Sequence, residues 1–442
     1  MVPKARLLSL TITAVLLAAI VLAFNAAPSQ AGAPVELNFW HAMSRSRGEK
    51  LNALVNRFNA KNPGIKVNAV FVGAANPKLG NDYNALYSKI LENLARETPP
   101  DVSQVYENWT TQLIEIGALT PVDKFINGPD GMDKQSLNDF VPAFKNANTF
   151  TDETGSHLYT LPFNKSIYVL YYNKAIFHEL GLKAPQTWQE MRAAAKTIAT
   201  KKPGIAGISF LPNVDIFGHY LYTNGGQYIT EDHQVAFGGA LGIRDLNYWI
   251  DLVHTDRSAH ASLDASKEFE NGKAGMYIET TSRIGGFERA AKEKGLKFGV
   301  VPIPKGTVAA YQFAGTNLAI FSKSSPEKQQ AAWKFIKFMT STEITSDWAI
   351  STGYLPVRRS AINGKEYKSY IAQHPECAVG IKALDNATVQ PRVPAWESIR
   401  GILDDAMLEA LSRKYTSEDA IQKAVSLTNN LLNSITGSGS PR

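Results

Sequence analysis

The stretch VELNFWHAMSRSRGEKLNALVNRFNAKNPGIKVNAVFV, Val35 to Val72, has the pattern of a strand, a helix and a second strand. At its start, Val35, Leu37 and Phe39 alternate with polar residues, which is typical of a strand. Apolar residues then recur at helical spacing, and the triplet NPG ends the helix before the next strand. Two strands joined by a helix form the parallel crossover unit, so the sequence predicts an α/β fold.

Similar patterns continue along the chain. Helices are predicted from about 83 to 96, from Thr187 with a capping box at Glu190, from Ser325, and from about 416 to 432. A core strand is predicted at 167–172, with Asn164, Lys165 and Ser166 at its entry. Only 125–150 and 355–390 lack a clear pattern, and no flexible linker is evident. We therefore expect two α/β lobes joined by short crossings, with a hinge and a ligand cleft between them.

Length and composition indicate an ordinary globular protein. The chain has 442 residues, of which 44% are hydrophobic and 19% charged, enough for two domains with their own cores. The formal net charge is +6, but no Lys/Arg run with interleaved aromatic residues occurs. We expect no nucleic-acid partner.

The N-terminus has the three parts of a secretory signal. Lys4 and Arg6 precede an apolar run from Leu7 to Phe24, and small residues surround Ala31. This pattern predicts a signal peptide over residues 1–31, cleaved after Ala31, and export to a periplasm. An uncleaved anchor is the alternative, because the apolar run could just span a bilayer. The small-residue site and the polar residues after it favour cleavage.

No catalytic or metal-binding motif stands out. Cys377 is the single cysteine, which excludes a disulfide within the chain, and the eight histidines are scattered. The sequence contains no nucleophile elbow, zinc helix, phosphate loop or dinucleotide fingerprint. We expect no metal, no cofactor and no enzymatic activity.

Several motifs occur in an order that resembles a known family. They are FWH, QVYENWTTQLIEIGALTPV, LPFNKSIYVLYYNK, PQTWQEM, FENGKAGM, SPEKQQAAWKFIKFMTS and STGYLPVRRSA. From about 35 to 432, the chain resembles the extracytoplasmic solute-binding proteins of ABC importers, and among them the periplasmic proteins that bind sn-glycerol 3-phosphate. The resemblance implies a two-lobed periplasmic binding protein fold and a monomer that passes its ligand to an ABC permease with a cytoplasmic ATPase.

On this resemblance, the N-terminal lobe comprises 32–148 with about 300–345. The C-terminal lobe comprises 149–299 with about 346–435, and 436–442 form a flexible tail. The implied ligand is glycerol 3-phosphate or a glycerophosphodiester such as glycerophosphocholine.

The resemblance also implies ligand-binding residues. Tyr83 and Glu107 correspond to residues that meet the glycerol hydroxyls. The phosphate is expected at a group of hydroxyl donors, a glycine amide and a guanidinium, the mixture that suits an anion. This group comprises Ser166, Thr280, Gly315, Tyr354 and Arg392, with Thr281 or Ser282 as alternatives to Thr280.

Two positions depart from the family pattern. Leu211 stands where the family has a tryptophan over the glycerol moiety, which leaves room for a larger head group. Phe217, Tyr220 or Trp40 could then face a cationic head group. Lys165 stands where the family has serine, and we expect it to be a solvated rim charge rather than a source of positive potential in the cleft.

Other functions and roles remain open at this stage. The same fold could bind a sugar or polyol, or the chain could be a secreted phosphodiester hydrolase. Glu107 could simply begin a helix, and Arg392 could hold a structural carboxylate.

Overall fold

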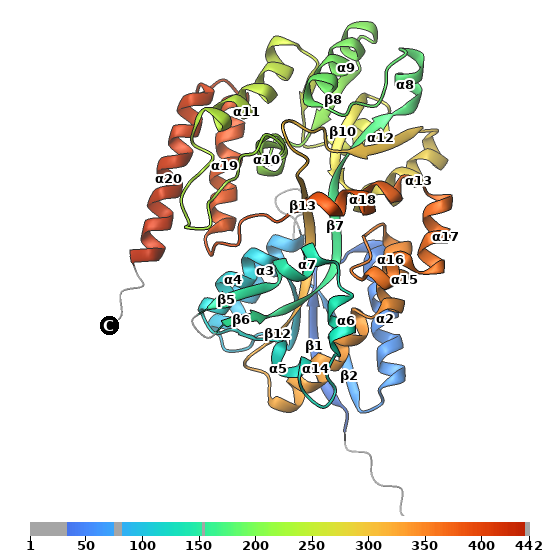
Figure 1. Ribbon diagram of the computed structural model, residues 1–442, viewed down its shortest axis with the longest axis vertical. Coiled ribbons are helices and arrows are strands. Elements are labelled where there is room, and N and C mark those ends of the chain that lie inside the picture. The colour runs from blue at the N-terminus through green and yellow to red at the C-terminus, as the bar shows by residue number, and fades with distance from the viewer. Residues whose placement is uncertain (1–32, 75–81, 153–154, 438–442) are drawn as a thin grey trace, which may run out of the picture.

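The computed structural model describes residues 33–74, 82–152 and 155–437, which form two lobes stacked along the long axis (Figure 1). The expected signal peptide and residues 438–442 of the expected tail lie outside these ranges. Two long strands, β7 (Thr160–Asn173) and β12 (Tyr311–Phe321), run from one lobe into the other. The predicted α/β fold with crossing strands is confirmed.

Eleven of the described strands belong to one sheet, whose main path is β2-β1-β3-β12-β7-β10-β8-β9. The first part of β7 pairs antiparallel with β12, from Thr160 opposite Ala319 to Ile167 opposite Phe313. Its second part pairs antiparallel with β10 (Ala274–Thr280) and β11 (Phe298–Pro302). Strand β7 is therefore shared by the half-sheets of both lobes.

The lower lobe in Figure 1 is built on parallel pairing of β1 with β2 and β3, with β12 antiparallel to β3. Its elements are β1 (Val35–His41), α2 (Arg45–Lys61), β2 (Ile65–Phe71), α3 (Asp82–Ala95), β3 (Val102–Val105), α4 (Glu107–Glu115), β4 (Leu119–Thr120), α5 (Asp123–Ile126), α6 (Lys134–Asn138), α7 (Pro142–Ala147), the hairpin β5 (Thr149–Asp152) and β6 (Gly155–Leu158), and α14 (Pro326–Met339).

The upper lobe contains the parallel pairs β10–β8 and β8–β9, covered by helices. Its elements are α8 (Lys174–Glu179), α9 (Trp188–Lys201), β8 (Ala206–Phe210), α10 (Val214–Thr223), α11 (Ala240–Ile250) with η1 (Asp251–Thr255), β9 (Ala259–Ala261), α12 (Ala265–Glu270), η2 (Thr281–Arg283), α13 (Ile284–Lys294), α19 (Trp396–Leu411) and α20 (Ser417–Gly437).

A third group of short elements follows α14 along one side of the molecule and across the waist. They are α15 (Thr342–Thr352), α16 (Arg359–Asn363), α17 (Lys365–Gln373), α18 (Cys377–Ala383), η3 (Leu384–Asn386) and β13 (Ala387–Thr388).

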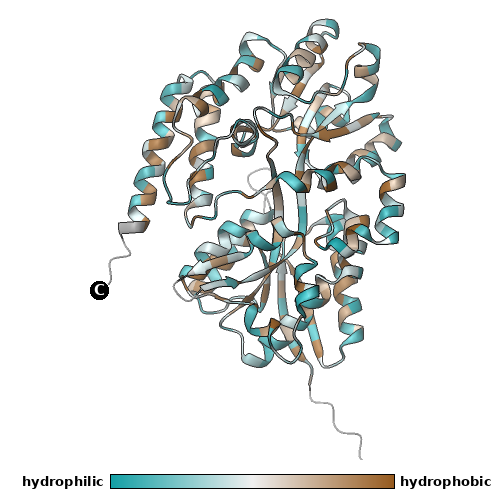
Figure 2. Cartoon of the chain, in the orientation of Figure 1, coloured by the Kyte–Doolittle hydropathy of each residue, from teal (hydrophilic) through white to brown (hydrophobic). Residues whose placement is uncertain are grey.

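Local sequence explains the main helices. Helix α2 buries Leu51, Leu54, Val55 and Phe58, the residues that the helical spacing predicts. Helix α9 begins with the predicted capping box, in which the Thr187 side chain accepts from the Glu190 amide. Hydrophobic and hydrophilic residues alternate along the helices that cover the sheet (Figure 2), as expected for amphipathic helices.

Two sequence-based expectations differ from the structure. Strand β7 begins at Thr160, so Asn164, Lys165 and Ser166 lie inside a buried strand rather than at the entry of one beginning at 167. The patternless segments 125–150 and 355–390 contain short helices of four to nine residues. Helices this short carry too few turns to show a periodic apolar pattern.

Candidate functional site

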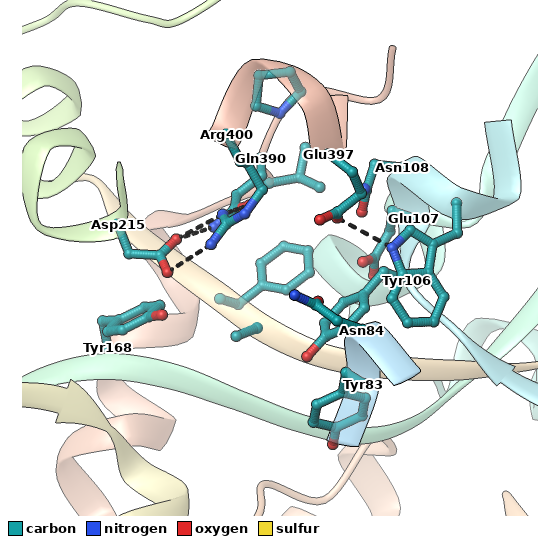
Figure 3. A pocket seen from close by; sticks show the side chains of 15 residues that line it. Tyr83, Asn84, Tyr106, Glu107, Asn108, Tyr168, Asp215, Gln390, Glu397 and Arg400 are labelled. Carbon is teal, nitrogen blue, oxygen red and sulfur yellow. Dashed lines mark hydrogen bonds and ion pairs between the residues drawn. The ribbon is translucent and has the colours of Figure 1, made fainter. Parts of the chain in front are cut away.

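A cavity lies between the lobes, next to the crossing strands β7 and β12 (Figure 3). The lower lobe supplies residues of α3 and of the start of α4, whereas the upper lobe supplies residues of α10 and α19. The lining residues are Tyr83, Asn84, Tyr106, Glu107, Asn108, Trp109, Tyr168, Asp215, Phe313, Ala314, Val389, Gln390, Pro391, Glu397 and Arg400.

The first group of lining residues, Tyr106 to Trp109, follows the end of β3. All four residues of the strand are buried, and Tyr106 continues it in an extended conformation before α4 begins at Glu107. An acidic residue in the first turn is favoured by the positive end of the helix dipole. The strand-to-helix turn thereby places Tyr106, Glu107, Asn108 and Trp109 side by side at the cavity.

Glu107 forms a buried ion pair with Lys165 of β7. The Lys165 side chain is fully buried, and its Nζ donates to Glu107 Oε1 and, over 2.9 Å, to the carbonyl of Gly315. Burial lowers the pKa of Lys165, and the charge of Glu107 opposes this shift. The expected solvated rim position of Lys165 is therefore wrong, because the side chain neutralises Glu107 inside the protein.

Asp215 and Arg400 form a second ion pair, on the upper-lobe side of the cavity. Arg400 is bidentate, with Nη1 2.9 Å from Asp215 Oδ1 and Nη2 3.0 Å from Oδ2. Gln390 bridges the pair by donating to Asp215 and accepting from Arg400. Burial alone raises the pKa of Asp215, but the charge and hydrogen bonds of Arg400 outweigh it and hold this pKa at about 2. Asp215 is thus ionised at any ordinary pH.

Glu397, near the start of α19, reaches across to the lower lobe. Its Oε1 accepts from Asn108 Nδ2 over 2.6 Å and from Trp109 Nε1 over 3.1 Å. These two bonds connect α19 with α4 across the cavity (Figure 3). Both bonds use Oε1, and neither uses Oε2, the second carboxylate oxygen of Glu397.

Aromatic rings form much of the wall. Tyr106 packs edge-on against Tyr83 and Trp109, with ring centroids 5.1 Å and 4.9 Å away. Tyr168 of β7 and Phe313 of β12 also line the cavity. Burial raises the pKa values of Tyr106 and Tyr168 well above the usual range, so both are neutral phenols.

Two of the residues predicted from the family resemblance line this cavity, Tyr83 and Glu107. Gly315 adjoins it, next to the lining residue Ala314. Tyr354 is buried beside it, with its hydroxyl 3.4 Å from that of Tyr83. The structure thus brings four predicted residues together around the crossing strands.

Ser166, Thr280 and Leu211 are not among the lining residues. Ser166 and Thr280 are buried, and Thr280 Oγ1 lies 2.9 Å from Ser282 Oγ. Leu211 follows β8 with 37% of its surface exposed. Their ligand contacts stay predictions.

Arg392, the expected phosphate ligand, is not among the lining residues, although Pro391 before it is, and its phosphate contact stays a prediction. Its Nη1 donates to the carbonyls of Asn146, Ala147 and Thr149, and the guanidinium lies 5.1 Å from the ring centroid of Phe150. These contacts attach the segment before α19 to the lower lobe. The guanidinium that faces the cavity is that of Arg400.

Sequence reasoning missed several lining residues, above all Arg400, Asp215, Glu397 and Tyr168. Arg400 follows Trp396 by four positions, which places both on one face of α19. That spacing was visible in the sequence, whereas the meeting of α10 with α19 depends on a sequence separation of 185 residues. Trp40, Phe217 and Tyr220, named as candidates for a cationic head group, are not lining residues.

Within the described ranges, the structure contains no cluster of three or more His, Cys, Asp or Glu side chains that could hold a metal. Among the same residues, no helix has the length and apolar character needed to cross a membrane.

The family model of bacterial extracellular solute-binding proteins matches residues 44–345. The chain belongs to this family. The sn-glycerol-3-phosphate-binding periplasmic protein UgpB of Salmonella typhimurium is 28% identical over 91% of this chain and 94% of its own length. The Yersinia enterocolitica UgpB is 26% identical over 92% and 94%.

Solved structures show the same fold. UgpB from Mycobacterium tuberculosis in complex with glycerophosphocholine aligns with a TM-score of 0.77 and 24% identity, over 92% of this chain and all of the other. The GacH receptor of Streptomyces glaucescens, known also in complex with acarbose, aligns with a TM-score of 0.78 and 22% identity, over 90% and 99%.

Membership in this family defines the general function. The protein is the solute-binding component of an ABC importer. It therefore binds a small molecule outside the cytoplasm and presents it to a membrane permease. The solute-binding proteins of this family are not enzymes. The cavity between the lobes is the candidate site for that small molecule.

Proposed function

We propose that this solute-binding protein captures a glycerophosphodiester with a cationic head group, such as glycerophosphocholine, in the cavity between its lobes. The observation that carries the proposal is the charge pattern of the cavity, where three carboxylates and one guanidinium are set among aromatic rings. A zwitterion with one phosphate charge and one ammonium charge matches that pattern. The similarity to UgpB supports the glycerol phosphate part of the ligand.

Arg400 is proposed as the phosphate ligand. A guanidinium has five N–H donors, and Asp215 and Gln390 engage three of them. Two donors therefore remain for the oxygens of a phosphodiester. In this proposal, Arg400 takes the role that the sequence comparison gave to Arg392, whose guanidinium already donates to three backbone carbonyls.

The head group is proposed to lie against the aromatic wall. Tyr106, Trp109 and Phe313 offer ring faces, which attract a quaternary ammonium. Oε2 of Glu397 lies at the same wall and supplies the opposite charge. Tyr83 and Glu107 are proposed to bind the glycerol hydroxyls, as the family resemblance implies.

A neutral sugar or polyol is the second candidate. Two cations at the cavity are already paired, Lys165 with Glu107 and Arg400 with Asp215. Aromatic rings beside carboxylates also suit sugar hydroxyls, and the GacH receptor, with a similar fold, is known in complex with acarbose.

Isothermal titration calorimetry of the exported chain tests the proposal with three ligands: glycerophosphocholine, glycerol 3-phosphate and maltose. We expect saturable binding of glycerophosphocholine, and recovery of the ligand unchanged. Saturable binding of maltose without binding of glycerophosphocholine would refute the proposal.

A pair of arginine variants tests the phosphate contact. Arg400→Gln is expected to weaken glycerophosphocholine binding by about tenfold or more, because a charge-assisted hydrogen bond to the phosphate is lost. Arg392→Gln is the matched control and should change the affinity by less than about threefold. If Arg392→Gln weakened binding more than Arg400→Gln, Arg392 rather than Arg400 would be the phosphate ligand.

A further inference from the structure

Asp215 lies in the first turn of α10 and points into the cavity toward Arg400 (Figure 3). The residue is 7% exposed, and its carboxylate is held by the two guanidinium nitrogens and by Gln390 Nε2 at 2.6 Å. Asn213 and Asp404 fix the turn itself, because their side chains accept from the amides of Ile216 and Val214. The carboxylate is therefore a rigid part of the site.

The charges around this position leave little capacity for a second negative charge on the ligand. Arg400 is the only Lys or Arg among the described residues that line the cavity, and Asp215 already neutralises it. Lys165 is buried behind Glu107 and is neutralised in the same way. Glu397 adds a carboxylate that is bound only by neutral N–H donors.

We propose, building on the glycerophosphodiester function above, that Asp215 is a specificity-determining residue that admits phosphate diesters and excludes phosphate monoesters. A diester carries one negative charge, whereas a monoester carries about −1.5 to −2 at pH 7. The first charge is met by the free donors of Arg400. The additional charge of the monoester faces the fixed carboxylate of Asp215 at close range, and no unpaired Lys or Arg is among the described residues that line the cavity to offset it.

A specificity-determining role of Asp215 and a purely structural role predict different results when Asp215 is replaced. If Asp215 only held Arg400 in place, its loss would weaken every ligand that Arg400 binds. If Asp215 excludes monoesters, its loss should strengthen their binding, because the guanidinium gains a full uncompensated charge. The sign of the change therefore distinguishes the two roles.

Calorimetry of Asp215→Asn with glycerol 3-phosphate and glycerophosphocholine is the main test. We expect glycerol 3-phosphate to bind at least about tenfold more tightly than to the unmodified chain. The affinity for glycerophosphocholine should rise by a smaller factor, because its phosphate carries only one negative charge, so the preference for the diester over the monoester narrows. Asp405→Asn removes an equal charge from the exposed side of α19 and should change neither affinity.

An unchanged ratio of the two affinities in Asp215→Asn, or an equal weakening of both ligands, would overturn the inference. If the unmodified chain does not bind glycerophosphocholine at all, the proposed function fails instead, so the two failures are distinguishable.

A second measurement needs no variant. The second phosphate pKa of a monoester is about 6, so most glycerol 3-phosphate carries one charge at a pH of about 5. The unmodified chain should bind it more tightly at that pH than at pH 7.5, while binding of glycerophosphocholine stays the same. The diester is the control for titration of the protein groups that interact with Asp215. These are Tyr168 on β7, His219 on α10, Tyr228, Glu279 on β10, and Arg400 and Asp404 on α19. Tighter binding of both ligands at low pH, or of neither, would contradict the role of Asp215.

Discussion

Gly315 sits where β12 crosses between the lobes, and its backbone accepts no other residue without strain. Its φ is +102°, and a Cβ at this position would lie 1.9 Å from the carbonyl oxygen of Asn164 on β7. The strand register shifts one position later, between Thr316 and Asn317. Gly315 therefore permits both the close approach of the two crossing strands and the bend in their pairing.

Gly315→Ala is expected to lower the free energy of unfolding by about 3 kcal/mol or more, because β7 and β12 must move apart. Urea denaturation would measure the change. Gly285→Ala is the matched control, since a Cβ there would have no heavy atom within 4 Å and the residue lies in the first turn of α13. Gly285→Ala should leave the free energy of unfolding unchanged or raise it slightly. An equal loss of stability in Gly315→Ala and Gly285→Ala would contradict the steric role of Gly315.

The ion pair of Lys165 and Glu107 is the most deeply buried charge pair of the site. Lys165→Met is expected to destabilise the protein by about 3–5 kcal/mol, because it leaves the carboxylate of Glu107 buried without a partner. Adding Glu107→Gln to this variant should restore much of the loss, as measured by urea denaturation. Lys174→Met removes a more exposed pair with Glu376 and should cost at most about 1 kcal/mol. A similar cost for Lys165→Met and Lys174→Met would show that burial of the first pair is energetically unimportant.

Asp404 gives the site a pH-dependent stability. Burial raises the pKa of its carboxyl from 3.8 to about 6, against the hydrogen bond from the Val214 amide and the charge of Arg400. The folded state therefore holds this proton more tightly than the unfolded chain, and stability increases as the pH falls from above 6 toward 4.

Asp404→Asn keeps the acceptor for the Val214 amide but removes the buried charge. We expect it to raise the free energy of unfolding at pH 7.5 by about 1–2 kcal/mol, and to have little effect near pH 4. Chemical denaturation at the two pH values would show the difference. If Asp404→Asn stabilised the protein equally at pH 7.5 and near pH 4, the stabilisation would not come from removal of the buried charge.

At the scale of elements, α9 provides the clearest link from sequence to structure. Thr187 and Glu190 form a reciprocal capping box, in which each side chain binds the amide of the other residue. Thr187→Ala is expected to cost about 1 kcal/mol of stability. Thr197→Ala in the same helix should cost nothing or stabilise slightly, because Thr197 is a partly exposed helix-interior residue. Thermal denaturation of the two variants would separate the cap from general helix propensity.

Elements with strong local patterns could be predicted from the sequence. The β1–α2–β2 unit, the cap of α9 and the Ser325 start of α14 follow from alternation, helical spacing and capping residues close together in the chain. The strand β7 was predicted too short, because Asn164, Lys165 and Ser166 interrupt its apolar run. Their burial depends on partners that are 58 to 152 positions away in the sequence.

The candidate site was only partly predictable for the same reason. Tyr83 and Glu107 followed from motifs of the family, and both line the cavity. Arg392 and Arg400 lie close together in the chain, and sequence alone could not decide which of them faces the cavity. The pairing of Arg400 with Asp215 arises from the packing of α19 on α10, which no local pattern encodes.

At the scale of the whole molecule, β7 and β12 are shared between the lobes and pass directly beside the cavity. Side chains of both lobes meet there, as when Glu397 of α19 accepts from Asn108 and Trp109 of α4. A ligand that touches both lobes stabilises their closed arrangement, and its binding energy shifts the population toward that state. In the proposed function, the permease recognises this closed shape.

A crystal structure of the chain grown with glycerophosphocholine tests the account most directly. We predict the ligand between the lobes, its phosphate within hydrogen-bonding distance of the Arg400 guanidinium and its trimethylammonium group against Tyr106, Trp109 and Glu397. A ligand bound outside this cavity, or a phosphate held by Arg392 while Arg400 contacts only Asp215 and Gln390, would contradict the account.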